Sequence, residues 1–280
     1  MFRLQQIINE VHRDRDVCDM VIRQATEILV ALGIHHDLAN NYLRNLVKRE
    51  ISDLAKEEKF TRRDIDGLFV AEDITDLIKP LSMADILSLK MADRAERWFS
   101  KISPHLLPEG SLLDLGGGSG EVAKRMLLPN RPVSIADALD WRKGEAKTLP
   151  YLPVINNEVV HPPFDQVVVI TAFHHSDDPD ALVAEAFRLA KKRVIFIESV
   201  TNSRFMYLYG SWIDWFYNHI VHYSEKIEDK IHVPCLFKPA TGWEQLVWRL
   251  TGLSPTVSKD LGIFQSLNPE WHHLFVYDIR

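Results

Sequence analysis

The chain has few of the features that mark secreted or membrane-spanning proteins. It holds only two cysteines in 280 residues, too few for a disulfide framework or a cysteine-based zinc site. No run approaches the roughly 20 uncharged apolar residues that span a bilayer. The first residues also lack the apolar core of a secretory signal. We therefore expect a cytoplasmic protein with no membrane partner.

The chain also has no excess of basic charge. Lys and Arg together number 33 against 39 Asp and Glu, a formal net charge of −6, whereas dedicated nucleic-acid binders usually carry a basic surface. Apolar residues make up 46% and charged residues 26% of the chain, enough apolar surface to form a folded core. The composition excludes a mainly disordered chain and argues against a nucleic-acid partner.

The pattern of apolar residues changes along the chain. Within residues 1–100 they recur at helical spacing, with charged residues between them, which predicts an all-helical region. After residue 110, short apolar runs alternate with helical stretches, as in βαβ units with a parallel sheet. The runs that we interpret as strands are 111–115, 133–137, 152–155, 164–171, 194–198, 257–261 and 273–277.

The strongest local signal is a glycine-rich turn between an apolar run and a helical stretch. Residues 114–120 read D-L-G-G-G-S-G, so that Asp114 lies near the end of the run. The turn glycines are Gly116, Gly117, Gly118 and Gly120. They would let a polar ligand reach the backbone N–H groups at a helix N-terminus. A dinucleotide fingerprint fits less well, because Glu121 or Ala123 stands at its third glycine and the acids would face a diphosphate.

In the frame D-x-G-x-G-x-G the turn resembles motif I of class I S-adenosylmethionine-dependent methyltransferases of the small-molecule type. The resemblance implies an α/β fold with a Rossmann-like, seven-stranded, mostly parallel sheet over residues 101–280. It implies S-adenosyl-L-methionine as the cofactor, cradled by Asp114 and the glycines. The resemblance does not extend to residues 1–100, which we expect to form a helical cap, substrate or dimerisation region. Within the family-like part, an aromatic-rich insertion would occupy about 201–240.

The same resemblance places further cofactor contacts where the strands end. A carboxylate at Asp137 can accept hydrogen bonds from both ribose hydroxyls, with Ala138 beside it and Asp140 as a rival. Asn156 or Asn157 would meet the adenine amino group. The remaining candidates lie where the run at 164–171 ends and are Thr171, Ala172 and Phe173.

A general base is required only if the acceptor loses its proton near the transition state. His174 is the first candidate for this base. The other candidates are His175, His219, His222 and Tyr223. We expect no functional metal, because adjacent histidines on a turn diverge and no H-x-x-x-H spacing accompanies them.

Eight aromatic residues crowd positions 205–223. They suit a flat or apolar acceptor, although core packing or a homodimer interface would also explain them. We predict methyl transfer to an O, N or C atom of a small, aromatic or apolar molecule. The alternatives are a cyclisation, decarboxylation or hydroxylation on the same fold and cofactor, or a degenerate methyltransferase-like binding module.

Overall fold

The computed structural model describes residues 13, 15–31, 34–46, 83–221, 234, 236–264 and 270–279. The chain divides into two compact units. Unit 1 consists of Met1–Lys90, Asn202–Cys235 and Gln265–Glu270, and unit 2 consists of Met91–Thr201, Leu236–Phe264 and Trp271–Arg280. The expected boundary at residue 100 falls within helix α7 (Met83–Ile102). A cap or dimerisation role for residues 1–100 stays a prediction.

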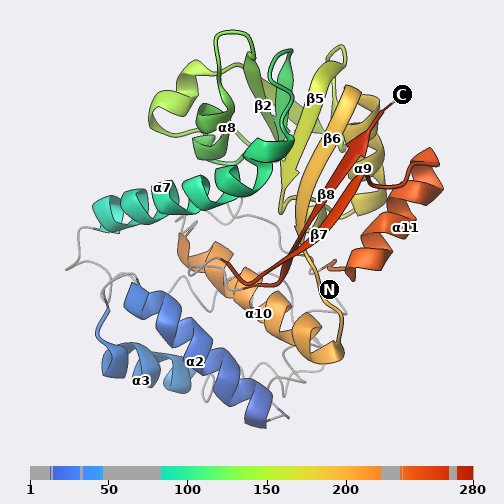
Figure 1. The fold of residues 1–280 in the computed structure, drawn as a ribbon. Helices are drawn as coiled ribbons and strands as arrows, with labels where there is room; N and C mark the ends of the chain where they lie inside the picture. Colours follow the sequence, from blue (N-terminus) through green and yellow to red (C-terminus); the bar gives the residue numbers. More distant parts are fainter. Residues whose placement is uncertain are drawn as a thin grey trace. The chain divides into compact units, whose positions relative to one another are not determined.

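Unit 2 is built on one eight-stranded sheet in the order β4-β3-β2-β1-β5-β6-β8-β7 (Figure 1). Its strands are β1 Leu112–Leu115, β2 Val133–Asp137, β3 Tyr151–Ile155, β4 Glu158–Val159, β5 Phe164–Ile170, β6 Ala190–Ser199, β7 Val257–Gly262 and β8 His272–Asp278. The central strands β3, β2, β1, β5 and β6 pair in parallel, and β4, β8 and β7 join antiparallel. The predicted Rossmann-like, mostly parallel α/β fold is confirmed, with all seven expected strands present.

The eighth strand, β4, was not predicted. It has two residues and returns from β3 through a tight turn at Asn156 and Asn157, both at positive φ. Its outer edge is covered, because the Val159 N–H donates to Glu185 Oε1 at 2.7 Å and Arg188 donates to the Val159 carbonyl at 2.9 Å. A run of only two residues is too short to be recognised as a strand from the sequence. The hydrogen bonds that cover its outer edge also come from side chains that are distant in the sequence.

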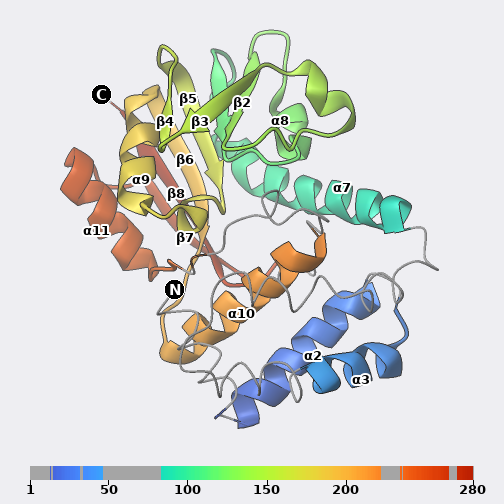
Figure 2. The ribbon, with the colours of Figure 1, turned by 180° about the vertical axis from the view of Figure 1, so that it is seen from behind.

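Helices cover both faces of this sheet (Figure 2). They are α8 Glu121–Met126, α9 Pro179–Arg188 and α11 Ala240–Thr251, together with α7. Side chains of β5 alternate between the two buried clusters: Val167 packs with Val183 and Trp243, whereas Val168 packs with Trp98 and Met126. A strand covered on both faces explains why residues 164–170 read as an almost continuous apolar run.

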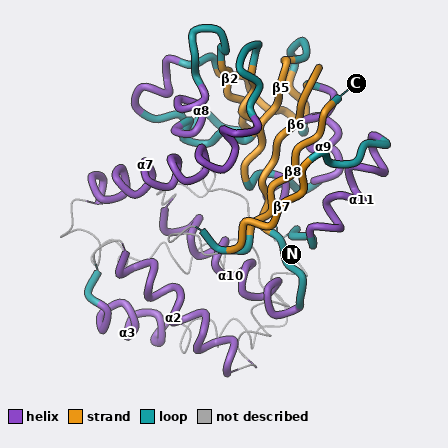
Figure 3. Tube along the Cα trace, viewed as in Figure 1, coloured by secondary structure: helices purple, strands orange, loops and turns teal. Residues whose placement is uncertain are grey.

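The described part of unit 1 is helical (Figure 3). Its helices are α2 Arg15–Ala31, α3 His36–Leu46, the start of α7, and α10 Arg204–Val221. Helix α2 packs against α3 and α10, and its Val21, Ala25 and Leu29 form a buried stripe at the expected spacing. The predicted N-terminal helices are confirmed in these ranges. Among the described residues, no helix is both long and apolar enough to cross a membrane.

Candidate active site

The glycine loop joins β1 to α8 where the parallel strands end. Gly116 has φ +74°, and a Cβ there would lie 2.4 Å from the Cβ of Ala172. Gly118 has φ +52°, but a Cβ there would meet no heavy atom within 4 Å. The loop therefore contacts the segment after β5 closely at Gly116 and has open space beside Gly118, on which a ligand could lie.

This loop lies at the point where the strand order reverses. Strand β1 pairs with β2 on one side and with β5 on the other, so the chain leaves it in opposite directions. The Gly116 N–H donates to the Ala136 carbonyl at 2.7 Å, which joins the ends of β1 and β2. Open α/β sheets bind ligands in the crevice at such a reversal, outside the carboxyl ends of the strands.

Two carboxyl groups lie beside the glycine loop, where this rule places the ligand crevice. Asp137 Oδ2 accepts the Gly118 N–H at 2.9 Å, and its Oδ1 accepts the Ala138 N–H at 2.7 Å. Asp114 is buried at 2% exposure, and its Oδ2 has no hydrogen-bond partner in the part of the chain that the structure describes. A buried acceptor without a donor is costly, so it is a position that a ligand's N–H or O–H would satisfy.

Burial and the nearby charge of Asp137 raise the pKa of Asp114 to about 7. Burial also raises the pKa of Asp137, although the backbone N–H groups of Gly118, Ala138 and Leu139 oppose this. Two adjacent carboxyls of this kind disfavour a diphosphate and favour hydroxyl donors or a cationic group. This electrostatic environment fits S-adenosylmethionine, which carries ribose hydroxyls, an ammonium group and a sulfonium group, but no phosphate.

Asp140, the rival to Asp137, has a different environment. Its two oxygens accept from Arg142 at 2.7 and 2.8 Å, and this exposed pair lowers the pKa of Asp140 to about 2. The Asp140 carboxylate thus faces a guanidinium rather than the glycine loop. The geometry therefore favours Asp137 as the acid of the crevice.

Asn156 and Asn157 form the turn between β3 and β4. Asparagine tolerates positive φ better than most residues, so this turn by itself accounts for both side chains. Asn157 Oδ1 also accepts the Ser176 hydroxyl at 3.0 Å, which ties the turn to the segment that precedes α9. A contact of either residue with adenine stays a prediction.

The segment after β5 is strained. Thr171 has φ +49°, which is rare for a β-branched residue, and its N–H donates to the Ile197 carbonyl at 2.7 Å. Phe173 is fully buried, with its ring 5.3 Å from that of Phe196, so its side chain belongs to the core. Of the three candidates here, Ala172 lies against the glycine loop.

His174 forms a buried pair with Glu198. It lies on the turn η5 (Phe173–His175) after β5, and Glu198 lies near the end of the neighbouring strand β6. The distance from His174 Nδ1 to Glu198 Oε2 is 2.6 Å, and Glu198 Oε1 accepts the Phe173 N–H at 2.8 Å. Their side chains are 1% and 0% exposed. The sequence pattern placed Glu198 at the end of a strand but gave it no role.

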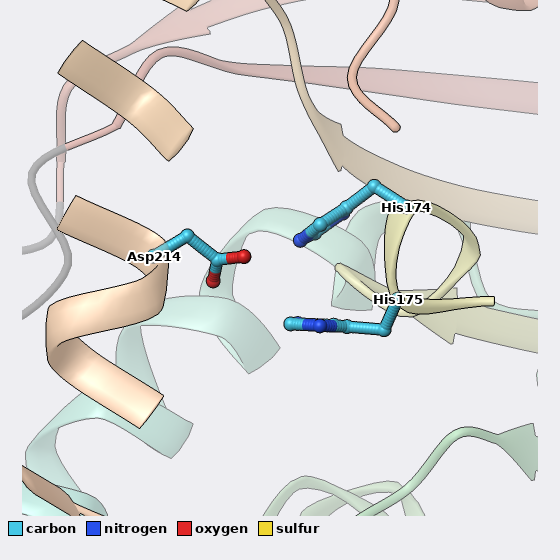
Figure 4. Close-up of side chains that lie close together, drawn as sticks. All are labelled: His174, His175 and Asp214. Carbon is cyan, nitrogen blue, oxygen red and sulfur yellow. The ribbon is translucent and has the colours of Figure 1, made fainter. Parts of the chain in front are cut away.

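The remaining candidate bases have different positions. The expectation that the adjacent histidines diverge is wrong: the His175 ring lies 4.2 Å from the His174 ring, and Figure 4 shows both rings extending from the same turn. His219 belongs to α10 in unit 1, as does Asp214, which Figure 4 also labels. His222 and Tyr223 lie outside the described residues. The predicted acceptor pocket of aromatic residues also stays a prediction, because most of those side chains are not described.

The fold, the glycine loop and its position at the strand-order reversal define a class I S-adenosylmethionine-dependent methyltransferase. Residues 88–250, more than half of the chain, match a family described as a methyltransferase domain. The chain belongs to that family, and S-adenosylmethionine is its methyl donor. A comparison with curated protein sequences finds no match.

Several solved structures are similar in fold. Magnesium protoporphyrin IX methyltransferase from Synechocystis, solved with S-adenosylhomocysteine, is 10% identical, with 86% of this chain and 97% of that chain covered and a TM-score of 0.47. The 1,6-didemethyltoxoflavin N1-methyltransferase of Burkholderia thailandensis is 11% identical over 80% of this chain and 92% of its own, with a TM-score of 0.47. A methyltransferase from Aquifex aeolicus is 12% identical over 68% and 98%, with a TM-score of 0.45.

Proposed function

We propose that this methyltransferase acts on an O, N or C atom of a small, aromatic or apolar molecule, and that His174 accepts the acceptor's proton. The observation that carries the proposal is the buried pair of Glu198 with His174, which lies on the turn that follows β5. His174 lies two residues after Ala172 in the chain, and Ala172 lies against the glycine loop. A histidine held by a carboxylate in this position suits an acceptor, such as a phenol or an amine, that must lose a proton.

The crevice residues have separate roles in this proposal. Asp137 and the Gly118 N–H would hold the ribose, and the buried Asp114 would satisfy a donor on the amino-acid part of the cofactor. Bound S-adenosylmethionine would supply an activated methyl group, whose carbon would bond to an electron pair of the acceptor while the sulfur would keep the pair of the broken bond. The protein then has to align the acceptor and exclude water.

Calorimetric titration with S-adenosylmethionine tests the cofactor site. We expect wild-type protein to bind, and Asp137→Ala to bind at least about 10-fold more weakly, because a bidentate acceptor of hydroxyl groups is lost. Asp140→Ala is the matched control, since it removes the neighbouring acid that pairs with Arg142. Equal loss in both variants would argue against Asp137, and no binding by wild type would favour a degenerate binding module.

Transfer is tested with methyl-labelled S-adenosylmethionine and three acceptor types: a phenol, an aromatic amine and a 1,3-diketone. Incorporation of the label, with a product heavier by one methylene unit, supports methylation. A product of another mass, formed without label, would instead support cyclisation, decarboxylation or hydroxylation. The preferred acceptor type indicates the chemical class of acceptor that is methylated.

A further inference from the structure

We propose that Glu198 is a positioning residue that holds His174 in the neutral tautomer whose basic nitrogen is Nε2, an inference that rests on the proposed function. The two residues are 24 positions apart and are brought together only by the pairing of β5 with β6, in which Ile170 lies opposite Ile197. The distance between His174 Nδ1 and Glu198 Oε2, 2.6 Å, indicates a strong hydrogen bond.

The chemistry of the pair determines which ring nitrogen carries hydrogen. A carboxylate only accepts hydrogen bonds, so His174 Nδ1 must be the donor. In the neutral ring the basic lone pair then lies on Nε2. The proton of the acceptor passes to Nε2, and the resulting imidazolium keeps its Nδ1–H on Glu198 until the Nε2 proton leaves to water.

Two further contacts hold this arrangement. The other oxygen of Glu198, Oε1, accepts the Phe173 N–H at 2.8 Å, so one carboxylate orders both the side chain of His174 and the backbone of its turn. On the ring itself, Phe237 stacks with a centroid distance of 4.7 Å and an interplanar angle of 24°. Phe237 precedes Lys238, whose carbonyl accepts the Thr201 N–H at 3.2 Å just after β6.

Glu198→Gln is the variant that separates tautomer from fold. The Gln side chain has nearly the same shape, and its carbonyl can still accept the Phe173 N–H. Its amide group, however, donates toward Nδ1 and so favours the tautomer with hydrogen on Nε2. We expect kcat to fall roughly 100-fold, the usual contribution of a general base, while the KM for S-adenosylmethionine stays unchanged. Glu198→Asp keeps a carboxylate and should recover part of the loss.

Glu185→Gln is the matched control. Glu185 is also buried and also accepts a backbone N–H, that of Val159 at 2.7 Å, but it lies on α9 and pairs with Arg188. The control should leave kcat unchanged, because Glu185 contacts none of the groups at His174. A kcat that falls equally in Glu198→Gln and Glu185→Gln would overturn the inference, since it would reflect stability alone.

Nitrogen NMR of histidine-labelled protein gives a second, independent readout. The His174 signal, assigned by its loss in His174→Asn, should show hydrogen on Nδ1 in wild type and on Nε2 in Glu198→Gln. A wild-type ring with hydrogen on Nε2 would overturn the inference even if Glu198→Gln did not fold. The proposed function fails separately: wild type would then not bind S-adenosylmethionine. Equal rates of methylation by wild type and by Glu198→Gln would overturn only the role of Glu198.

Discussion

Asp137 holds the glycine loop by its Oδ2, which accepts the Gly118 N–H at 2.9 Å. The bond runs from the end of β2 to the loop after β1, so the acid proposed to bind ribose also shapes the loop that the cofactor contacts. The carboxylate has lone pairs to spare for hydroxyl groups beside this backbone bond. The binding surface is therefore ordered before the ligand arrives, which lowers the entropic cost of binding.

Asp137→Asn separates these two roles. The Asn side chain can still accept one backbone N–H but cannot accept bonds through both of its terminal atoms. We expect the free energy of unfolding to drop by about 1 kcal/mol, and S-adenosylmethionine to bind about 10-fold more weakly. Chemical denaturation and calorimetry measure the two effects. Unchanged affinity would contradict the assignment of ribose to Asp137.

Asp114 predicts a pH dependence of stability. Its pKa is about 7 in the folded protein against an ordinary value of 3.8, so the folded state keeps a proton that the unfolded state loses. The free energy of unfolding should therefore fall as pH rises from about 4 to 7, by at most about 4 kcal/mol from this group, and then level off. Asp114→Asn removes this contribution.

As pH rises across this range, the free energy of unfolding of wild-type protein should thus fall relative to that of Asp114→Asn. Denaturation curves recorded at several pH values test it, because the titration of groups other than Asp114 and its neighbour Asp137 is common to both proteins and cancels. Parallel pH profiles would show that Asp114 titrates near its ordinary pKa.

Substitutions in the glycine loop should separate fold from binding. Gly116→Ala forces a Cβ to 2.4 Å from that of Ala172, so we expect a loss of about 3 kcal/mol, partly restored by adding Ala172→Gly. In Gly118→Ala the added Cβ meets no heavy atom within 4 Å, so we expect the free energy of unfolding to fall by only about 1 kcal/mol, because alanine disfavours the positive φ. Gly118→Val should nevertheless abolish S-adenosylmethionine binding. Thermal denaturation and calorimetry distinguish these outcomes, and normal affinity in Gly118→Val would place the cofactor elsewhere.

The edge of the sheet provides a prediction away from the crevice. Arg188 donates to the Val159 carbonyl and pairs with the buried Glu185, so Arg188→Ala should destabilise the edge by about 2 kcal/mol. Hydrogen exchange at the Val159 amide should accelerate. Arg249→Ala, which removes an exposed ion pair with Asp180, is the control and should change little. Equal protection of Val159 in both variants would show that the edge does not depend on Arg188.

Local features could be predicted from the sequence because their signals are local. The glycine loop is marked by consecutive residue types, and the stripe of Val21, Ala25 and Leu29 follows from helical spacing alone. By contrast, Glu198 and His174 meet only through the register of β5 on β6, which no local pattern encodes. The one available hint was an acid closing an apolar run, the same signal that indicated Asp114.

Two other features have physical causes of the same kind. Asn156 and Asn157 were interpreted through a family resemblance as candidates for the adenine contact, which stays a prediction, whereas the hairpin turn that they form between β3 and β4 was not predicted. The division into units was expected at one point in the chain. The structure instead assembles unit 1 from three separate segments, and packing between distant segments cannot be inferred from periodicity.

This interleaved connectivity limits how the protein can be dissected. A fragment beginning at residue 101 would keep α10 but lose α2, the helix against which α10 packs within unit 1. The side of α10 that packs against α2 would then be exposed to water, and exposed apolar surfaces promote aggregation. A fragment restricted to the residues that match the family is therefore expected to aggregate. Shortened variants should keep all three segments of unit 1.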